Sequence, residues 1–174
     1  PGRTPPVLGA DPARGWPLTV DLGLPIAADP VLEDDAEAVA ALVEVVSMYA
    51  EVQRTLAQDQ STRRTVRVPA FPSADAVGYA ATLADQLAVL PPGDKRRLDE
   101  SGQKVVAEGL RQLAQDAERL EASGIPDSLQ HNDLHLWNAL RAPDGGVAMI
   151  DLGDAVWSHP FASLLIPSWI LRAR

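Results

Sequence analysis

The chain has 174 residues, of which 46% are apolar, with 15 basic and 24 acidic side chains and a formal net charge of −9. This apolar content excludes a disordered acidic tail, and the length fits one compact domain. The absence of cysteine excludes disulfides and thiolate zinc sites, and the acidic balance argues against nucleic-acid binding. The sequence contains no apolar run long enough to cross a bilayer and no opening signal peptide, so we expect a soluble, cytoplasmic protein without a membrane partner.

The first thirty residues predict a β-hairpin followed by a hinge. Two apolar runs, residues 6–10 and 16–20, flank a turn that is rich in Pro and Gly at residues 11–15. A connector punctuated by prolines follows at residues 21–30. Because the chain begins at Pro1 without a methionine and ends inside an apolar, helix-compatible stretch, we expect a fragment of a longer protein.

Three amphipathic helices are predicted next, at residues 33–58, 73–90 and 94–122, because apolar residues recur there every three or four positions. We expect the apolar stripes of all three helices to lie in the core. The N-caps expected for the second and third helices are Ser73 and Asp94. Residues 59–72 are predicted to be a loop. Its basic residues, Arg63, Arg64 and Arg67, are expected to be solvated rather than to contact an anion.

After Gly124 the pattern changes to short apolar runs, at residues 128–130, 139–141 and 147–150, between polar loops. The sequence Pro143-Asp144-Gly145-Gly146 predicts a hairpin turn, because Asp-Gly supplies the backbone freedom that such turns need. All three histidines and both asparagines lie in this last part of the chain, which is therefore where we place the chemistry.

The residues His131, Asp133 and Asn138 have the spacing His-x-Asp-x-x-x-x-Asn, and Asp151 follows thirteen residues later. Phosphoryl transfer needs a carboxylate that deprotonates the attacking hydroxyl, and oxygen ligands for Mg²⁺. Asp133 can be the carboxylate, and Asn138 and Asp151 can be the ligands. The intervening hairpin would return Asp151 to the same cleft, beside the hinge. His131 is better suited to holding the loop through hydrogen bonds than to titrating.

At residues 131–138 and at Ile150-Asp151 the chain resembles the aminoglycoside phosphotransferase and choline kinase-like family, which has a protein-kinase-like fold. The family's loop reads His-Gly-Asp-Leu-His-x-x-Asn, and this chain matches it at His131, Asp133, Leu134, His135 and Asn138. The resemblance implies that Asp133 is the catalytic base, that Asn138 and Asp151 hold Mg²⁺, and that ATP is the phosphoryl donor. It also implies that the adenine of ATP is held by backbone groups of three hinge residues, Val20, Asp21 and Leu22.

The chain departs from the family pattern at several positions. Asn132 replaces the usual glycine, and Leu136-Trp137 replaces the commoner Pro-Gly. The family's phosphate-covering loop and strand lysine have no counterpart, because the two lysines, Lys95 and Lys104, both follow the hinge. We therefore expect the chain to be inactive in transfer on its own.

These observations predict an α+β, protein-kinase-like fold. Residues 1–24 would be the remnant of an N-terminal lobe, consisting of a short β-hairpin and the hinge. Residues 25–174 would be a mostly helical C-terminal lobe with a catalytic β-hairpin. The sequence leaves the oligomeric state open.

Three functions remain open. The first is an ATP-dependent kinase that phosphorylates a hydroxyl of a small molecule, an aminoglycoside or a similar amine-bearing compound. The second is an inactive kinase-like binding module, and the third is a zinc hydrolase that uses His131, Asp133 and His135. In the kinase interpretation His135 is a structural loop residue. Asp154 is either an acid near the metal or the cap of a helix that starts at Trp157, and His159 positions the next helix.

Overall fold

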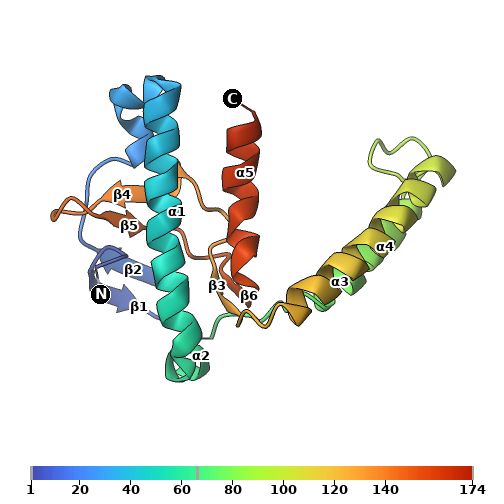
Figure 1. Ribbon diagram of the computed structural model, residues 1–174, viewed down its shortest axis with the longest axis horizontal. Coiled ribbons are helices and arrows are strands. Elements are labelled where there is room, and N and C mark those ends of the chain that lie inside the picture. Colours follow the sequence, from blue (N-terminus) through green and yellow to red (C-terminus); the bar gives the residue numbers. More distant parts are fainter. Residues whose placement is uncertain (1, 66, 174) are drawn as a thin grey trace.

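The computed structural model describes residues 2–65 and 67–173, and it divides into a mixed body and a projecting helical arm (Figure 1). The α+β composition expected from the sequence is confirmed. None of the helices in these two ranges is both long and apolar enough to cross a membrane. The helices are α1 (Asp35–Gln58), α2 (Gln60–Thr65), α3 (Asp75–Ala88), α4 (Glu100–Ala122) and α5 (Leu165–Arg172).

The strands of the described residues form three two-stranded antiparallel sheets. The pairs are β1 (Val7–Asp11) with β2 (Trp16–Thr19), β3 (Ser128–Gln130) with β6 (Val156–Ser158), and β4 (Ala139–Arg141) with β5 (Val147–Met149). Short 3₁₀ segments lie between β2 and α1 (η1, Ile26–Ala28, and η2, Pro30–Glu33), between β3 and β4 (η3, Leu136–Asn138), and between β6 and α5 (η4, Pro160–Leu164).

The predicted N-terminal hairpin is confirmed as β1–β2. It exposes four large apolar side chains, each 63–66% accessible: Val7, Leu8, Trp16 and Leu18. Two backbone contacts attach the residues around this hairpin to the C-terminal sheet. The N–H of Met149 donates to the carbonyl of Arg3 at 2.8 Å, and Pro25 forms an isolated bridge with Leu140.

Helix α1 is the centre of the body, and it begins two residues after the predicted start. The carboxylate of Asp34 caps it by accepting from the N–H groups of Ala36 and Glu37. Its buried face contributes Val45 and Tyr49 to the core. The residues that pack against this face come from η1, the loop before η3, and the β4–β5 hairpin: Ile26, Leu134, Ala139, Val147 and Met149.

The expected loop at 59–72 contains a helix, α2. The carboxylate of Asp59 accepts hydrogen bonds from Ser61 and Thr62, which satisfies the donors at the start of that helix. Of its arginines, Arg63 places its guanidinium 5.5 Å from the centre of the buried Trp157 ring. The prediction of a loop is therefore wrong for residues 60–65, whereas the expectation that its arginines are solvated is confirmed, since all three are exposed.

The predicted caps of the next two helices are also wrong. Ser73 makes no side-chain cap to α3, whereas Asp94 binds the N–H and guanidinium of Arg96 instead of capping a helix. Helix α4 begins later, where the carboxylate of Asp99 accepts from the N–H of Gly102 at 2.7 Å. Asp94 and Asp99 are both suitable N-cap residues, so the sequence alone does not show which of them caps α4.

Helices α3 and α4 do not contribute their stripes to the core as predicted. They pack against each other and extend from the body as a hairpin, coloured green and yellow in Figure 1. Two helices alone cannot enclose side chains, so α3 has no buried residue and α4 has one, Ala117. At the base of this arm, Phe71, Ala117 and Leu165 line a cavity of about 560 Å³.

The C-terminal part of the fold agrees with the sequence prediction at the β4–β5 hairpin and differs from it at residues 156–158. The predicted β4–β5 hairpin is confirmed, with Gly145 in the left-handed region at φ 81°. The helix expected from Trp157 onward is wrong, because residues 156–158 form β6 and pair with β3. The next helical segment begins after His159, whose ring accepts from the N–H of Phe161, with Pro160 in the first position. The prediction that His159 positions the next helix is therefore confirmed.

Candidate active site

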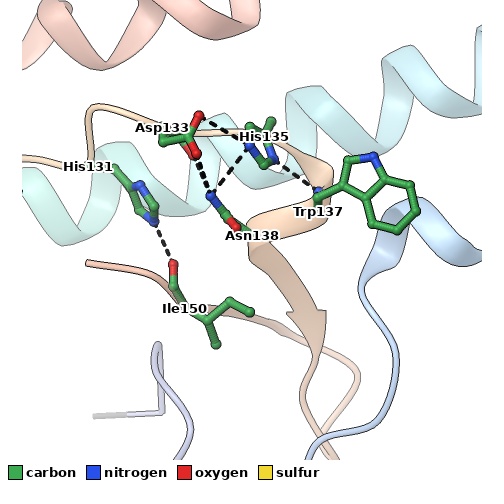
Figure 2. Close-up of polar contacts among 6 residues, drawn as sticks. All are labelled: His131, Asp133, His135, Trp137, Asn138 and Ile150. Carbon is green, nitrogen blue, oxygen red and sulfur yellow. Dashed lines mark hydrogen bonds and ion pairs between the residues drawn. The ribbon is translucent and has the colours of Figure 1, made fainter. Parts of the chain in front are cut away.

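The candidate site is a loop that runs from the end of β3 through η3 into β4. Asp133 and Asn138 meet on this loop: the amide nitrogen of Asn138 donates to Asp133 Oδ2 and to the Asp133 carbonyl, both at 3.0 Å. Figure 2 shows these two side chains facing each other, with His135 beside them. Because its nitrogen faces Asp133, Asn138 leaves its amide oxygen as the end that a cation could use.

His135 holds the Asp133 carboxylate from a second side. Its Nε2 lies 3.1 Å from Asp133 Oδ1, and its Nδ1 accepts from the N–H of Trp137 at 3.2 Å. An Nδ1 that accepts a hydrogen bond carries no proton, so Nε2 is the protonated nitrogen and donates to the carboxylate. The Asp133 side chain nevertheless stays 49% exposed, which leaves it open to a reactant.

His131 connects this loop to the end of β5. The imidazole is fully buried, makes an edge-to-face contact with Tyr49, and places Nε2 2.8 Å from the carbonyl oxygen of Ile150. The N–H of Ile150 in turn donates to the carbonyl of Asn138 at 3.0 Å. Asp151, the next residue, is exposed and begins the segment after β5.

Two non-glycine residues of the site have left-handed backbone conformations: Asn132 at φ 64° and Asp151 at φ 60°. Asparagine and aspartate tolerate this region better than other non-glycine residues. The conformation explains why Asn132 can replace a glycine in this loop. Its side-chain nitrogen also donates to the carbonyl of Asp154 at 2.7 Å, which ties the loop to the segment after Asp151.

The other predicted residues are placed as follows. The N–H of Val20 donates to the carbonyl of Pro6, so this donor is not available to a nucleotide base. Asp21 is engaged through its side chain, whose carboxylate accepts from the N–H of Gly23. The side chain of Leu22, the third predicted residue, is partly buried. Asp154 does not cap a helix, and its carbonyl makes the contact to Asn132.

The zinc hydrolase hypothesis is wrong. Within residues 2–65 and 67–173, no three His, Asp or Glu side chains are grouped so that they could share a metal ion. His131 directs Nε2 to a backbone carbonyl, so it does not face the pair formed by Asp133 and His135.

Sequence reasoning missed a buried polar cluster that packs beneath the loop. Gln53 of α1 donates to the carbonyls of Leu129 and Pro160, at 3.0 and 3.1 Å. Gln130 and Ser163 are buried beside it, and Gln130 Oε1 accepts from the N–H of Ser163 at 2.8 Å. These contacts join α1, β3 and η4, so they fix the strand from which the loop starts. A glutamine on the apolar face of a helix was the one signal that could have indicated the cluster.

A family model described as phosphotransferase enzyme family matches residues 13–170. The match covers most of the chain and includes the whole loop with Asp133 and Asn138, so the chain belongs to the phosphotransferase enzyme family. This membership indicates a kinase-type enzyme. No curated protein and no solved structure matches the chain.

Proposed function

We propose that this chain carries the catalytic loop of an ATP- and Mg²⁺-dependent phosphotransferase that phosphorylates a hydroxyl of a small molecule. The observation that carries the proposal is the contact of Asp133 with Asn138 on a loop whose backbone is bonded to Ile150, next to Asp151. In the reaction a bond forms between the acceptor oxygen and the terminal phosphorus of ATP, and the bond from that phosphorus to the bridging oxygen breaks. The hydroxyl proton passes to Asp133.

The donor set fits Mg²⁺, which prefers carboxylate and amide oxygens. Asn138 Oδ1 and the exposed Asp151 carboxylate would hold the ion, while Asn138 Nδ2 keeps the Asp133 carboxylate oriented. The bound ion would neutralise charge on the nucleotide phosphates. His135 donates to the Asp133 oxygen that Asn138 does not contact, so the carboxylate is held at both oxygens before the acceptor arrives.

The protein-kinase-like arrangement and the domain division belong to the same proposal. Residues 1–24 would be the end of a nucleotide lobe and residues 25–174 the helical lobe. The exposed apolar side chains on β1 and β2 support this division, because exposed apolar patches mark surfaces that pack against something else. With the N–H of Val20 engaged, its carbonyl and the backbone groups of Asp21 and Leu22 are those we assign to the adenine.

The acceptor is proposed to be an amine-bearing hydroxyl compound, a class that includes the aminoglycosides. The net charge of −9 supports this class, because an acidic protein attracts cationic ligands.

An inactive, kinase-like binding module is the second candidate, and the placement of the lysines favours it. Lys95 lies between α3 and α4, and Lys104 lies on α4, where it pairs with Glu100. Both belong to the projecting arm (Figure 1), so neither supplies the phosphate-binding lysine of a kinase.

The proposal is tested with Mn²⁺–ADP as a paramagnetic probe of the chain. We expect selective broadening of the amide resonances near Asn138 and Asp151 by nuclear magnetic resonance. Asp151→Asn should abolish the broadening, and Asp144→Asn, in the β4–β5 turn, should not. Broadening that is unchanged by Asp151→Asn would exclude the proposed metal site. Transfer activity, measured as acceptor-dependent ADP formation by the protein with a lysine-bearing nucleotide lobe, separates the enzyme from the binding module.

A further inference from the structure

An apolar groove lies beside the candidate loop, between the first half of α1 and α5. It has a volume of about 420 Å³, within the range of about 300–1,000 Å³ that is usual for small-molecule sites. Most of its lining is aliphatic or aromatic. The main side chains are Val39, Leu42, Leu136, Trp137, Ile166 and Ile170.

One residue, His135, both lines the groove and contacts the candidate base, Asp133. His135 lines the groove, and its Nε2 lies 3.1 Å from Asp133 Oδ1. Figure 2 shows His135 between the Asp133 carboxylate and the Trp137 ring, which is directed away from the carboxylate. Trp137 is 61% exposed, so the groove has an open aromatic edge at the end of the loop. A molecule lying in the groove would therefore have its nearest end beside the half-exposed Asp133.

The lining selects a particular kind of molecule. Among the described residues 2–65 and 67–173, no Asp, Glu, Lys or Arg lines the groove, and His135 is the polar side chain at its inner end. An ammonium group placed inside would lose water without gaining a carboxylate partner, which is costly. Hydrocarbon placed there would instead gain the free energy of leaving water.

We propose that this groove binds the body of the acceptor, and that the acceptor is an alcohol with an apolar body and its hydroxyl at the His135 end. This inference rests on the proposed function and narrows it. An amine on such an acceptor stays outside the groove, and polycationic aminoglycosides are excluded from it.

The experiment measures binding of 1-butanol, 1-hexanol and 1-octanol to the chain labelled at its isoleucine methyl groups. The chain has five isoleucines, of which Ile166 and Ile170 line the groove and Ile125 lines a different apolar cavity. We expect chemical-shift changes at Ile166 and Ile170, little change at Ile125, and affinity that rises about fourfold for each added methylene. Kanamycin should leave Ile166 and Ile170 unshifted.

Two exposed tryptophans give a matched pair of variants. Trp137→Ala should weaken 1-octanol binding about tenfold, because it removes one wall of the groove. Trp169→Ala, on α5 at 58% exposure and outside the lining, should leave binding unchanged. Both side chains are exposed, so neither variant threatens the fold.

Four results would overturn the inference: equal shifts at Ile125 and Ile166, an affinity independent of chain length, octanol binding that is insensitive to Trp137→Ala, or kanamycin binding in the groove. The alcohol titration uses no nucleotide or metal, and the Mn²⁺–ADP experiment uses no acceptor. Failure of the groove is therefore distinguishable from failure of the proposed function.

Discussion

The buried imidazole of His131 is bonded through Nε2 to the carbonyl oxygen of Ile150, 2.8 Å away and nineteen residues further along the chain. Ile150 immediately precedes Asp151, and its own N–H is bonded to the carbonyl of Asn138. The strand end that carries Asp151 is thus attached to the loop at both of its ends. The loop that carries Asp133 and the segment that carries Asp151 are therefore expected to move together.

His131→Ala should lower the free energy of unfolding by about 2–3 kcal/mol. The substitution leaves the Ile150 carbonyl without its partner and opens a space against Tyr49. His135→Ala is the control: its side chain is 23% exposed, and we expect a loss below about 1 kcal/mol. Urea unfolding of both variants measures the difference. Equal losses would mean that His131 does not support the loop more than His135 does.

In the complete enzyme proposed above, Asp133→Asn and Asp151→Asn should affect different quantities. Asp133→Asn removes the base, so kcat should fall roughly 100-fold or more with Mg²⁺–ATP affinity nearly unchanged. Asp151→Asn removes a charged metal ligand, so both affinity and kcat should fall.

The split between these two variants is read from ATP titrations with and without Mg²⁺, alongside turnover. Asp144→Asn, in the exposed β4–β5 turn, is the control and should change neither quantity. If Asp133→Asn and Asp151→Asn behaved alike in both assays, the roles assigned to the two residues would be incorrect.

The chain by itself should turn over ATP no faster than a buffer blank. Phosphoryl transfer depends on positioning and on neutralising the phosphate charge, and both lysines lie on the arm. The double variant Lys95→Gln/Lys104→Gln should therefore leave the affinity for Mg²⁺–ATP unchanged. Turnover above the blank would contradict the expected inactivity of the chain. A loss of Mg²⁺–ATP affinity in the double variant would show that the arm takes part in phosphate binding.

The stability of the fold should decrease at alkaline pH because of Tyr49. Burial raises the pKa of the Tyr49 phenol well above its usual range, whereas in the unfolded chain it is about 10. The folded state therefore keeps its proton while the unfolded state loses one. The stabilisation is complete below pH 10 and is lost above it, by about 1.4 kcal/mol per pH unit.

Tyr49→Phe should remove this part of the pH dependence and cost about 1 kcal/mol at neutral pH, since the hydroxyl also donates to the Leu129 carbonyl. The two stability curves, from denaturant unfolding between pH 7 and 11, should converge above pH 10. Tyr79→Phe serves as the control, because Tyr79 is 65% exposed. Parallel curves for Tyr49→Phe and the native chain would contradict the assignment.

Local patterns in the sequence predicted the features that local physics determines. The turn rich in Pro and Gly at residues 11–15, between two apolar runs, and the Asp-Gly pair at 144–145 predicted the two hairpins. Asp133 and Asn138, which their spacing puts on one loop, contact each other there. A local pattern does not identify the segment against which an element packs. An apolar stripe does not say what it faces, so α3 and α4 were assigned to the core although they pack on each other.

Sequence patterns also did not predict the polar and apolar contacts between residues that lie far apart in the chain. Gln53 is separated by more than seventy residues from Leu129 and Gln130, and no periodicity connects them. The groove beside His135 combines side chains of α1, η3 and α5, which meet only after the chain has folded. Capping was ambiguous for a different reason, because Asp94 and Asp99 both have the chemistry of an N-cap.

The arm formed by α3 and α4 makes the protein tolerant of changes in length at one place. Its far end, around Pro91-Pro92-Gly93, is exposed, with Gly93 at φ 96°. Extra residues inserted there would lengthen a turn remote from the loop of Asp133, and adding whole helical turns to both helices would keep their stripes in register. An affinity tag or a small reporter domain can therefore be built into the middle of the chain at this point, whereas the same insertion between β4 and β5 would disturb the strand end that carries Asp151.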